Sequence, residues 1–526
     1  MKQLQFFALA AVALTAAFLS TSCPSPIKLF DKVEETVQSS NPGNLKVPES
    51  PTGFVAKALG SDSISLSWSS TKGTEAAYEF ERKMEATGTF RSVCPEALTE
   101  DASGFIDVDL RSLTTYYYRM RTTSSAGSSE WVTAFASTSQ LSAPLSFLAR
   151  PKQPGGVTLE WKDASDGEDG FAIERSLVQG GSYIESLVGP VSENSTTAFE
   201  AEASPRTEYF YRIRAFDAGG VSEWTYSPSV TTYPRCAYLA GMSKGLTIAD
   251  ISDPSDCKVL LSGLLMGVGG VAVHGDYAYA TSSTYGLRIL DISDPTSPTS
   301  VGTCSAISNY SYAVNATGDY VFAAGEWGFA IVDTTDKANP TITGTCPTLR
   351  AKDLIVISNY AYIADSNAGL RIIDISDKSS PVIVATCNTS GCAENLASAS
   401  DLIYVADIAG MRVVDVSVPT SPQILGEWET DGEAWSVAID LPYAYVANTA
   451  RSLTVLDVSD PTELVYTGSV PLKKVGQYDF VFDLAVSDGW TYAAGELGVK
   501  LINNPSNPTA VYHFSILGGV REVTIP

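Results

Sequence analysis

A six-residue phrase recurs seven times in the C-terminal half of the chain, and it limits the fold more than any other feature. Each copy is a short apolar run that ends on Asp or, once, on Asn, and the closing residues are 41, 42, 41, 41, 42 and 46 positions apart. A period near 42 that contains only strand-like segments is typical of a β-propeller, in which each blade has four short strands. The copies are GLTIAD (Gly245–Asp250), GLRILD (Gly286–Asp291), GFAIVD (Gly328–Asp333), GLRIID (369–374), GMRVVD (Gly410–Asp415), SLTVLD (Ser452–Asp457) and GVKLIN (Gly498–Asn503).

The two ends of the repeat region complement each other. One full unit begins with a small-residue inner strand at 269–275 and then has strands at 277–280 and 286–293, with an outer strand after the turn at 294–303. The region opens at 236–241 on a second strand with no first strand before it, and 518–526 is a first strand with nothing after it. We therefore predict an all-β chain whose residues 234–526 form a seven-bladed β-propeller closed by the C-terminal strand.

Two similar modules precede the repeats. Their landmarks are 93 residues apart, and both modules contain alternating strands that end in turn-forming residues. This pattern resembles the fibronectin type III β-sandwich, with a Trp on the second strand and a Tyr near the start of the sixth. We expect two such domains, at 47–140 and 141–233, and the resemblance implies that they act as spacers. The matched pairs are Trp68 and Trp161, Arg82 and Arg175, Tyr116 and Tyr209, and Trp131 and Trp224.

The N-terminus has the features of an export signal. Lys2 is followed by an apolar run at 6–19 and then by small residues before Cys23, which predicts a signal peptide at 1–22. Residues 19–23 resemble the lipobox of bacterial lipoproteins, which implies lipid attachment at Cys23; the alternative is an ordinary secreted protein with a stray cysteine. Residues 23–46 are polar and contain several prolines, so we expect a flexible tether. The expected location is the cell envelope, lipid-anchored at the outer membrane or cell surface.

The repeat phrase itself resembles a known family. Its form LRIID, at 370–374, is similar to the motif of the LVIVD-repeat family of bacterial and archaeal surface proteins. The resemblance implies a β-propeller in a cell-surface setting. It brings no established activity and no catalytic residues.

Composition excludes several functions. The net charge of −25 repels phosphate backbones and argues against nucleic-acid binding. The only histidines, His274 and His513, each lie in a predicted strand, so neither a His-rich metal site nor a Ser-His-Asp triad is expected. No spacing singles out a pair of catalytic carboxylates. We predict no catalytic residue, no metal and no cofactor, and we expect a monomer.

The repeated acids and the variable loops have different expected roles. The acid that closes each phrase most simply caps the following turn. The loops that differ from copy to copy share one face of the predicted disc, and aromatic side chains beside carboxylates there suggest a rim for a sugar or peptide; ordinary variable loop surface is the alternative. The candidate binding face comprises Tyr285, Glu326, Trp327, Asp365, Asp407, Trp428, Glu429, Asp431, Trp435, Arg451 and Glu496.

Seven cysteines follow Cys23, so at least one is unpaired. Cys387 with Cys392 and Cys236 with Cys257 are candidate disulfides, although spacing alone cannot fix pairing. Cys304 and Cys346 stand at equivalent repeat positions with Cys387, as expected of small buried hydrophobic residues.

Together these features predict a non-catalytic surface lipoprotein. The lipid anchors it, the two sandwiches form a stalk, and the propeller presents a binding face for a protein or glycan. Two alternatives remain open: an extracellular propeller enzyme acting on polysaccharide, and a structural component of the envelope.

Overall fold

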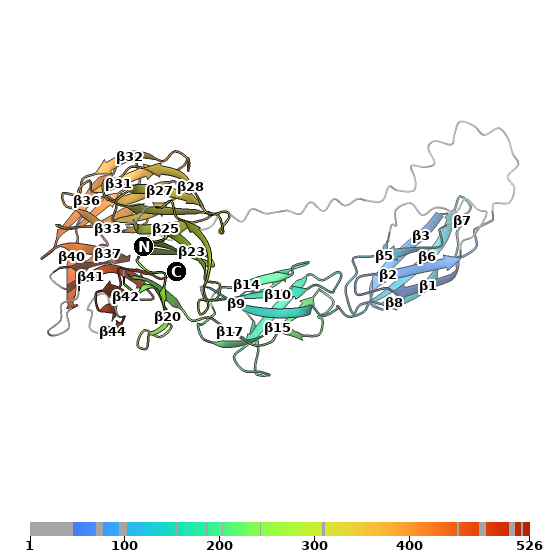
Figure 1. The fold of residues 1–526 in the computed structure, drawn as a ribbon. Coiled ribbons are helices and arrows are strands. Elements are labelled where there is room, and N and C mark those ends of the chain that lie inside the picture. The colour runs from blue at the N-terminus through green and yellow to red at the C-terminus, as the bar shows by residue number, and fades with distance from the viewer. Residues whose placement is uncertain are drawn as a thin grey trace, which may run out of the picture.

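The computed structural model describes residues 46–69, 77–93, 102–153, 155–185, 188–201, 203–241, 243–307, 311–449, 452–472, 480–503, 511–516 and 519–526. Within these ranges the regular structure consists of β-strands, with no helix, and so no helix that could cross a membrane. Two sandwiches follow one another along the chain and lead into a larger body of radially arranged sheets (Figure 1). The predicted signal peptide at 1–22, Cys23 and all of the predicted tether except Lys46 lie outside the described residues.

The first sandwich packs a three-stranded sheet, β1-β2-β5, against a five-stranded sheet, β4-β3-β6-β7 with β8 also paired to β6. Side chains alternate along β6: Tyr116, Tyr118 and Met120 are at most 2 % exposed, and the residues between them are less buried. The strands are β1 (Thr52–Ala58), β2 (Ile64–Ser69), β3 (Ala77–Met84), β4 (Arg91–Ser92), β5 (Gly104–Asp107), β6 (Thr115–Ser124), β7 (Gly127–Ser128) and β8 (Val132–Ser137).

The second sandwich repeats this arrangement, with sheets β14-β10-β9 and β12-β11-β15-β16, the latter with β13 and β17 attached. Its core contains Trp161, Phe171 and Tyr211. The strands are β9 (Leu145–Lys152), β10 (Gly156–Lys162), β11 (Gly170–Ser176), β12 (Ile184–Glu185), β13 (Val191–Ser192), β14 (Thr197–Glu200), β15 (Glu208–Phe216), β16 (Thr225–Tyr226) and β17 (Val230–Thr231).

Both sandwiches contain the same tyrosine contact at the start of the long strand. The hydroxyl of Tyr116 accepts a hydrogen bond from the Arg111 N–H at 2.8 Å, and that of Tyr209 accepts one from the Ser204 N–H at 3.0 Å. This is the tyrosine corner found in immunoglobulin-like sandwiches. The duplication therefore extends from sequence spacing to individual hydrogen bonds.

The remaining strands form seven four-stranded antiparallel sheets among the described residues. Six sheets use four consecutive strands, whereas the other has the order β20-β19-β18-β45. The strands are β18 (Cys236–Gly241), β19 (Gly245–Asp250), β20 (Lys258–Leu264), β21 (Val268–His274), β22 (Tyr277–Ser282), β23 (Gly286–Asp291), β24 (Thr299–Cys304), β25 (Ser311–Thr317), β26 (Tyr320–Gly325), β27 (Gly328–Asp333), β28 (Thr341–Cys346), β29 (Asp353–Ile357), β30 (Tyr360–Ala364), β31 (Leu370–Asp374), β32 (Val382–Cys387), β33 (Ala393–Ala399), β34 (Leu402–Asp407), β35 (Gly410–Asp415), β36 (Gln423–Glu429), β37 (Ala434–Asp440), β38 (Tyr443–Asn448), β39 (Ser452–Asp457), β40 (Val465–Pro471), β41 (Val481–Ser487), β42 (Trp490–Gly495), β43 (Gly498–Asn503), β44 (Val511–Ser515) and β45 (Glu522–Thr524).

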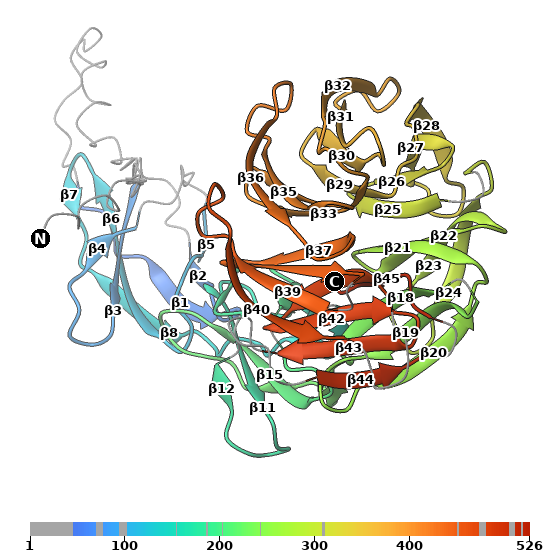
Figure 2. The same ribbon diagram turned by 90° about the vertical axis from the view of Figure 1, so that its left-hand side faces the viewer.

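The innermost strands surround a common axis (Figure 2). In the order β21, β25, β29, β33, β37, β41 and β45, each strand contacts the next, and β45 also contacts β21. β45 pairs antiparallel with β18, with Leu239 opposite Val523. Neighbouring sheets bury small, branched and aromatic side chains against each other, as in the cluster that contains Ala361, Ile331 and Phe322.

The closing acids of the repeat phrase cap turns, as predicted. In each of six sheets the Oδ1 atom of this Asp accepts a hydrogen bond from the N–H two residues later, at 2.8 to 2.9 Å. The residues are Asp250, Asp291, Asp333, Asp374, Asp415 and Asp457.

Neither candidate disulfide is formed: Cys236, Cys257, Cys387 and Cys392 are all free thiols. The thiol of Cys257 contacts the carbonyls of Asp253 and Pro254, and that of Cys392 contacts the side chain of Asn367. Each sulfur is therefore directed at a local oxygen and not at the predicted partner. Cys304, Cys346 and Cys387 are at most 9 % exposed, as expected of small buried side chains.

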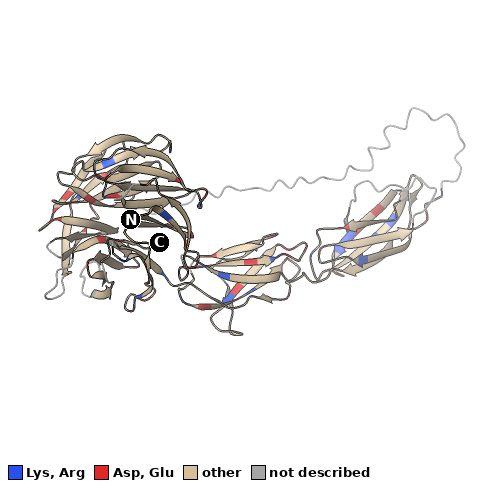
Figure 3. Cartoon of the chain, in the orientation of Figure 1, with Lys and Arg blue, Asp and Glu red and all other residues tan. Residues whose placement is uncertain are grey.

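Specific contacts connect the three bodies. The Ser112 N–H and hydroxyl in the first sandwich donate to Asp217 in the second at 2.6 and 2.8 Å. At the next junction Arg206 forms an ion pair with the buried Asp250, and the Gln153 amide donates to the Pro234 carbonyl at 3.0 Å. In both sandwiches basic residues lie beside acidic residues of a neighbouring strand (Figure 3), as in the ion pairs of Arg119 with Glu81 and of Arg212 with Glu174.

Candidate functional site

The strand register places one residue of each innermost strand at an equivalent position, opposite the second strand of its own sheet. Asp353 pairs with Ala364, Asn395 with Ala406, and Asp483 with Ala494. We call the seven equivalent residues the inner ring. They are Gly270, Ala313, Asp353, Asn395, Ser436, Asp483 and Glu522.

Side chains of the inner ring join one sheet to the next. The Oδ2 atom of Asp353 accepts a hydrogen bond from the Leu396 N–H at 2.8 Å, and the Oδ1 atom of Asn395 accepts one from the Val437 N–H at 2.9 Å. The pattern continues as Ser436 Oγ accepts from the Leu484 N–H at 3.0 Å and Asp483 Oδ2 accepts from the Val523 N–H at 3.0 Å. The Val271 N–H in turn donates to Glu522. Each polar side chain thus satisfies a backbone donor one residue beyond the ring position of the following sheet.

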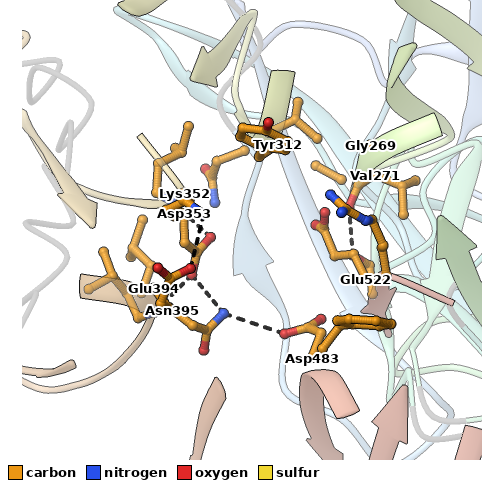
Figure 4. Close-up of a pocket in the computed structure, with 18 of the residues that line it drawn as sticks. Gly269, Val271, Tyr312, Lys352, Asp353, Glu394, Asn395, Asp483 and Glu522 are labelled. Atoms are coloured by element: carbon orange, nitrogen blue, oxygen red, sulfur yellow. Dashed lines mark hydrogen bonds and ion pairs between the residues drawn. The ribbon is translucent and has the colours of Figure 1, made fainter. Parts of the chain in front are cut away.

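Side chain to side chain contacts complete the network (Figure 4). The Asn395 amide lies between two carboxylates, with its Nδ2 atom 3.0 Å from Asp353 Oδ2 and 3.4 Å from Asp483 Oδ1. Ser436 Oγ lies 3.0 Å from Asn395 Oδ1 and 3.2 Å from Asp483 Oδ1. At Gly270 an added Cβ would lie 2.8 Å from Glu522 Oε2 and 3.0 Å from the Tyr312 carbonyl, so a larger residue there would require the Glu522 side chain to shift.

Burial makes the three carboxyl groups of the inner ring hard to ionise. It raises the pKa of Asp353 to about 7 and that of Asp483 to about 6, although backbone N–H groups oppose both shifts. The pKa of Glu522 is raised well above its usual value by burial and by the charges of Asp483 and Asp353. Near neutral pH the inner ring therefore carries less negative charge than its composition indicates.

The residues that precede the inner ring form a second tier, which we call the mouth. In five of the strands this residue is bypassed by the pairing register, and before β29 and β45 it is the residue that precedes the strand, so none of the seven is held in a regular strand pair. The mouth residues line a cavity of about 530 Å³ together with four members of the inner ring, namely Asp353, Asn395, Asp483 and Glu522. The mouth residues, in sheet order, are Gly269, Tyr312, Lys352, Glu394, Trp435, Phe482 and Arg521.

Charges at the mouth are partly paired. Lys352 forms an ion pair with Glu394 at 3.1 Å, and Arg350 forms one with Glu326 at 3.0 Å. The Tyr312 hydroxyl donates to Glu326 at 2.9 Å. The guanidinium of Arg521 lies 5.8 Å from the centre of the Tyr312 ring, within the range of a cation–π contact. The mouth therefore combines aromatic, basic and acidic groups around one opening.

The structure places most of the predicted binding face away from this cavity. Of the eleven candidates only Trp435 lines it, while Glu326 reaches its edge through Tyr312 and Arg350. Tyr285, Glu429, Asp431 and Glu496 are exposed. Trp327 is half-buried and donates to Ser311 Oγ at 3.1 Å, and Trp428, on an outer strand, stacks on Tyr466. Arg451 lies outside the described residues.

Two of the candidates are buried structural acids, which removes them from a surface that a ligand could touch. Asp365 is fully buried, accepts the N–H groups of Leu349 and Arg350 at 2.8 and 2.6 Å, and forms an ion pair with Arg371 at 2.6 Å. Asp407 is also fully buried and accepts the N–H groups of Ala409 and Gly410, both at 2.9 Å. Each acid holds its own loop in place.

The inner ring and most of the mouth were missed by the sequence reasoning, although a signal was present. Asp353, Asn395, Ser436, Asp483 and Glu522 are polar residues on inner strands that were expected to carry small side chains at a crowded axis. Aligning the seven inner strands would have placed them in one column. Among the described residues, no group of three or more His, Cys, Asp or Glu side chains has an arrangement that could hold a metal ion.

Comparison with known proteins identifies the repeats. A family model described as the LVIVD repeat matches residues 229–262, 267–306, 309–348, 350–389, 390–430 and 431–471. The last five matches each cover the four consecutive strands of one sheet, from β21 to β40, and the first covers β17 to β19 and part of β20. The chain therefore carries six LVIVD repeats, and the copy at β41 to β44 is outside the match. No curated protein matches the chain.

Three solved structures illustrate the likeness of its parts. A two-domain fibronectin type III segment of chicken tenascin is 16% identical, with 35% of this chain and 99% of that chain covered and a TM-score of 0.26. The β-propeller domain of Cps50 (Swd1) from Myceliophteria thermophila is 11% identical, with 47% and 86% covered and a TM-score of 0.39. Sqt1 of Saccharomyces cerevisiae is 11% identical, with 48% and 87% covered and a TM-score of 0.38.

Proposed function

We propose that this LVIVD-repeat chain is a non-catalytic binding protein of the cell envelope, and that its ligand, a glycan or protein, binds at the mouth of the axial cavity. In this proposal the seven four-stranded sheets are the blades of a closed propeller, with β45 completing the sheet of β18. The lipid on Cys23 anchors the chain at the outer membrane or cell surface. The two sandwiches are fibronectin type III-like domains, an assignment supported by their duplicated tyrosine corner, and they form the stalk.

One observation carries the proposed binding site. The sheets repeat closely along their length, but at the mouth the seven equivalent residues all differ: Gly269, Tyr312, Lys352, Glu394, Trp435, Phe482 and Arg521. A symmetric fold needs no such differences at its axis. Aromatic surfaces with a few convergent polar groups in a cavity of about 530 Å³ are the usual composition of a ligand site.

Substitution of the mouth aromatics tests this site. We expect Trp435→Ala to weaken ligand binding by tenfold or more, because a central tryptophan contact typically contributes about 2 kcal/mol. The measurement is the affinity of the exported chain, without its lipid, for ligands found on a glycan array and among envelope proteins of the source cell. Trp428→Ala is the matched control, since Trp428 stacks on Tyr466 on the outer strands. Equal affinities of the Trp435→Ala variant and the unmodified chain would remove the mouth from the proposal.

A second candidate function, hydrolysis of polysaccharide, is favoured by one observation. Asp353, Asp483 and Glu522 have raised carboxyl pKa values and line the cavity together, and glycosidases use pairs of carboxyl groups whose pKa values differ. However, Asp353 and Asp483 already accept backbone hydrogen bonds from neighbouring sheets, which suits a structural role better. Release of reducing ends that disappears in Glu522→Gln would establish the enzyme and overturn the binding proposal.

A further inference from the structure

Arg521 is the mouth cation without an acidic partner among the described residues. Lys352 and Arg350 each form an ion pair with a glutamate, whereas the guanidinium of Arg521 lies over the ring of Tyr312. Arg521 is exposed, and its backbone N–H donates a hydrogen bond to the Ala240 carbonyl at 2.7 Å. A guanidinium in this position has its fork of N–H donors available for a ligand oxygen pair.

The neighbours of Arg521 around the mouth leave room for such a ligand. On one side the next mouth residue is Gly269, which has no side chain, and the guanidinium extends past it to Tyr312. On the other side lie Phe482 and then Trp435, the two aromatic residues on adjacent inner strands β41 and β37. The opening is therefore bordered by a free guanidinium next to a pair of aromatic side chains.

The carboxylates deeper in the cavity do not compete for the same kind of group. Asp353 accepts three hydrogen bonds, from the Leu354 and Leu396 N–H groups and the Asn395 amide, at 2.7 to 3.0 Å. Asp483 accepts the Val523 N–H at 3.0 Å and is contacted by Ser436 and Asn395. Glu522, the third carboxyl of the cavity, accepts the Val271 N–H. Each carboxyl group is thus engaged by a neighbouring sheet, and Arg521 is the charged group of the mouth that is suited to bind an anion.

We propose that the mouth binds a sugar residue bearing a single carboxylate, with the carboxylate on Arg521 and the sugar ring against Trp435 and Phe482. The hydroxyl groups of the sugar would meet the Lys352–Glu394 pair on the opposite side. This inference rests on the proposed function, because it specifies the ligand of the same site. A lone carboxylate fits better than a polyanion, since the chain as a whole carries a net charge of −25 and repels highly charged polymers.

The test compares acidic and neutral sugars that share a scaffold. Sialyllactose is measured against lactose, and glucuronosyl-xylotriose against xylotriose, by calorimetry with the full exported chain. We expect at least one acidic member to bind tenfold or more tightly than its neutral counterpart. Arg521→Gln should abolish that preference while the affinity for the neutral sugar stays the same, and Arg521→Lys should restore it in part. Arg288→Gln is the matched control, because Arg288 also contacts a tyrosine ring, at 5.5 Å, but lies outside the cavity.

Each remaining outcome overturns the inference in a recognisable way. Equal binding of acidic and neutral sugars, with both weakened by Trp435→Ala, would show that the mouth binds sugars without recognising a carboxylate. Binding of an acidic peptide such as oligoglutamate, with no binding of any sugar, would show that the ligand is a peptide and not a glycan. Binding of none of these probes would overturn the inference as a whole. The mouth as the binding site of the proposed function is tested separately, and it fails if Trp435→Ala leaves the affinity for every envelope ligand unchanged.

Discussion

At the residue scale, the inner ring is where ionisable groups replace the small residues expected at the axis. Asp353, Asp483 and Glu522 are held by N–H groups from the next sheet, so each acid acts as a link between sheets. A buried polar group of this kind stabilises only while its hydrogen bonds are satisfied. The stability of the seven sheets that the inner ring joins therefore depends on the protonation of these three side chains.

Glu522→Gln should reduce the pH dependence of stability. The folded state raises the pKa of Glu522 well above its usual value, so between the unfolded and folded pKa values the folded chain binds more protons than the unfolded chain. The stability is then greatest below the unfolded pKa, about 4.3, and falls as pH rises toward the folded pKa, by at most about 1.4 kcal/mol per pH unit. Glutamine keeps the carbonyl that accepts the Val271 N–H and removes the titration.

The measurement is urea unfolding of both proteins from pH 5 to pH 8. The unfolding free energy of the unmodified chain should fall more steeply with pH than that of the variant. Asp353 and Asp483, with pKa values raised to about 7 and about 6, titrate in both proteins. Their contribution to the pH dependence of stability is therefore common to both curves. Parallel curves for the two proteins would show that Glu522 does not titrate in this way.

Residues with local roles could be predicted from the sequence, and residues with distant partners could not. The capping role of Asp374 depends on a hydrogen bond to the residue two positions later, so the sequence of a single repeat is enough to predict it. Asp353 instead bonds Leu396, in another sheet, and no local pattern contains that pairing. The buried positions of Asp365 and Asp407 were missed for the same reason, because each serves a loop whose backbone folds back over it.

At the element scale, six of the four-stranded sheets have an aspartate-capped turn between the third and outer strands. The turn after β31 is typical: Asp374 Oδ1 accepts the N–H of Ser376 at 2.8 Å and its hydroxyl at 2.6 Å. These bonds lower the pKa of Asp374. The outer strands, which include Trp428 and Tyr466, lie away from the axis. We therefore expect a change in one of these turns to alter the stability of the sheet and to have little effect on ligand binding.

Asp374→Ala should destabilise its sheet by about 1 kcal/mol, the usual net contribution of such a hydrogen bond. Asp374→Asn keeps an acceptor oxygen and should lose less. Because the folded pKa of Asp374 is lowered, its charged form stabilises the fold above the unfolded pKa of about 3.9, and this contribution is lost as pH falls through the folded pKa. Thermal unfolding at neutral and acidic pH measures both effects. A difference between Asp374→Ala and the unmodified chain that grows in acid would contradict the cap.

The strands and the repeat period were the most predictable elements. Alternation along β6 and the phrase spacing both follow from side-chain periodicity within a strand or a sheet. The disulfide pairs were wrong because spacing does not show where a thiol points, and the sulfur of Cys392 faces Asn367. Sequence reasoning placed the ligand on the variable loops, whereas the most varied set of equivalent residues lines the axis.

At the scale of the whole molecule, β45 joins strands from three sheets. It pairs with β18 and also contacts β21 and β41. Val520 and Val523 are at most 5 % exposed and pack in the same cluster as Leu239 and Tyr492. The segment thus contributes hydrogen bonds, buried apolar surface and the last link of the inner ring.

Deletion of 520–526 should cause cooperative loss of the propeller at a much lower temperature. The deletion exposes the edge of β18 and removes the N–H that Asp483 accepts. Calorimetry of the truncated and full chains measures the effect, and deletion of the exposed Pro526 alone is the control. An unchanged melting temperature in the longer deletion would rule out closure by this strand.

The pairing of β18 with β45 also has a consequence for biosynthesis. β45 is made after every other strand described here, so β18 leaves the ribosome with one edge unpaired and keeps it until synthesis of the body is complete. An unpaired edge can recruit other strands and aggregate. In an exported chain this interval falls during translocation, when the polypeptide is threaded and unfolded. Export would thus delay ring assembly until both partner strands have reached the same side of the membrane.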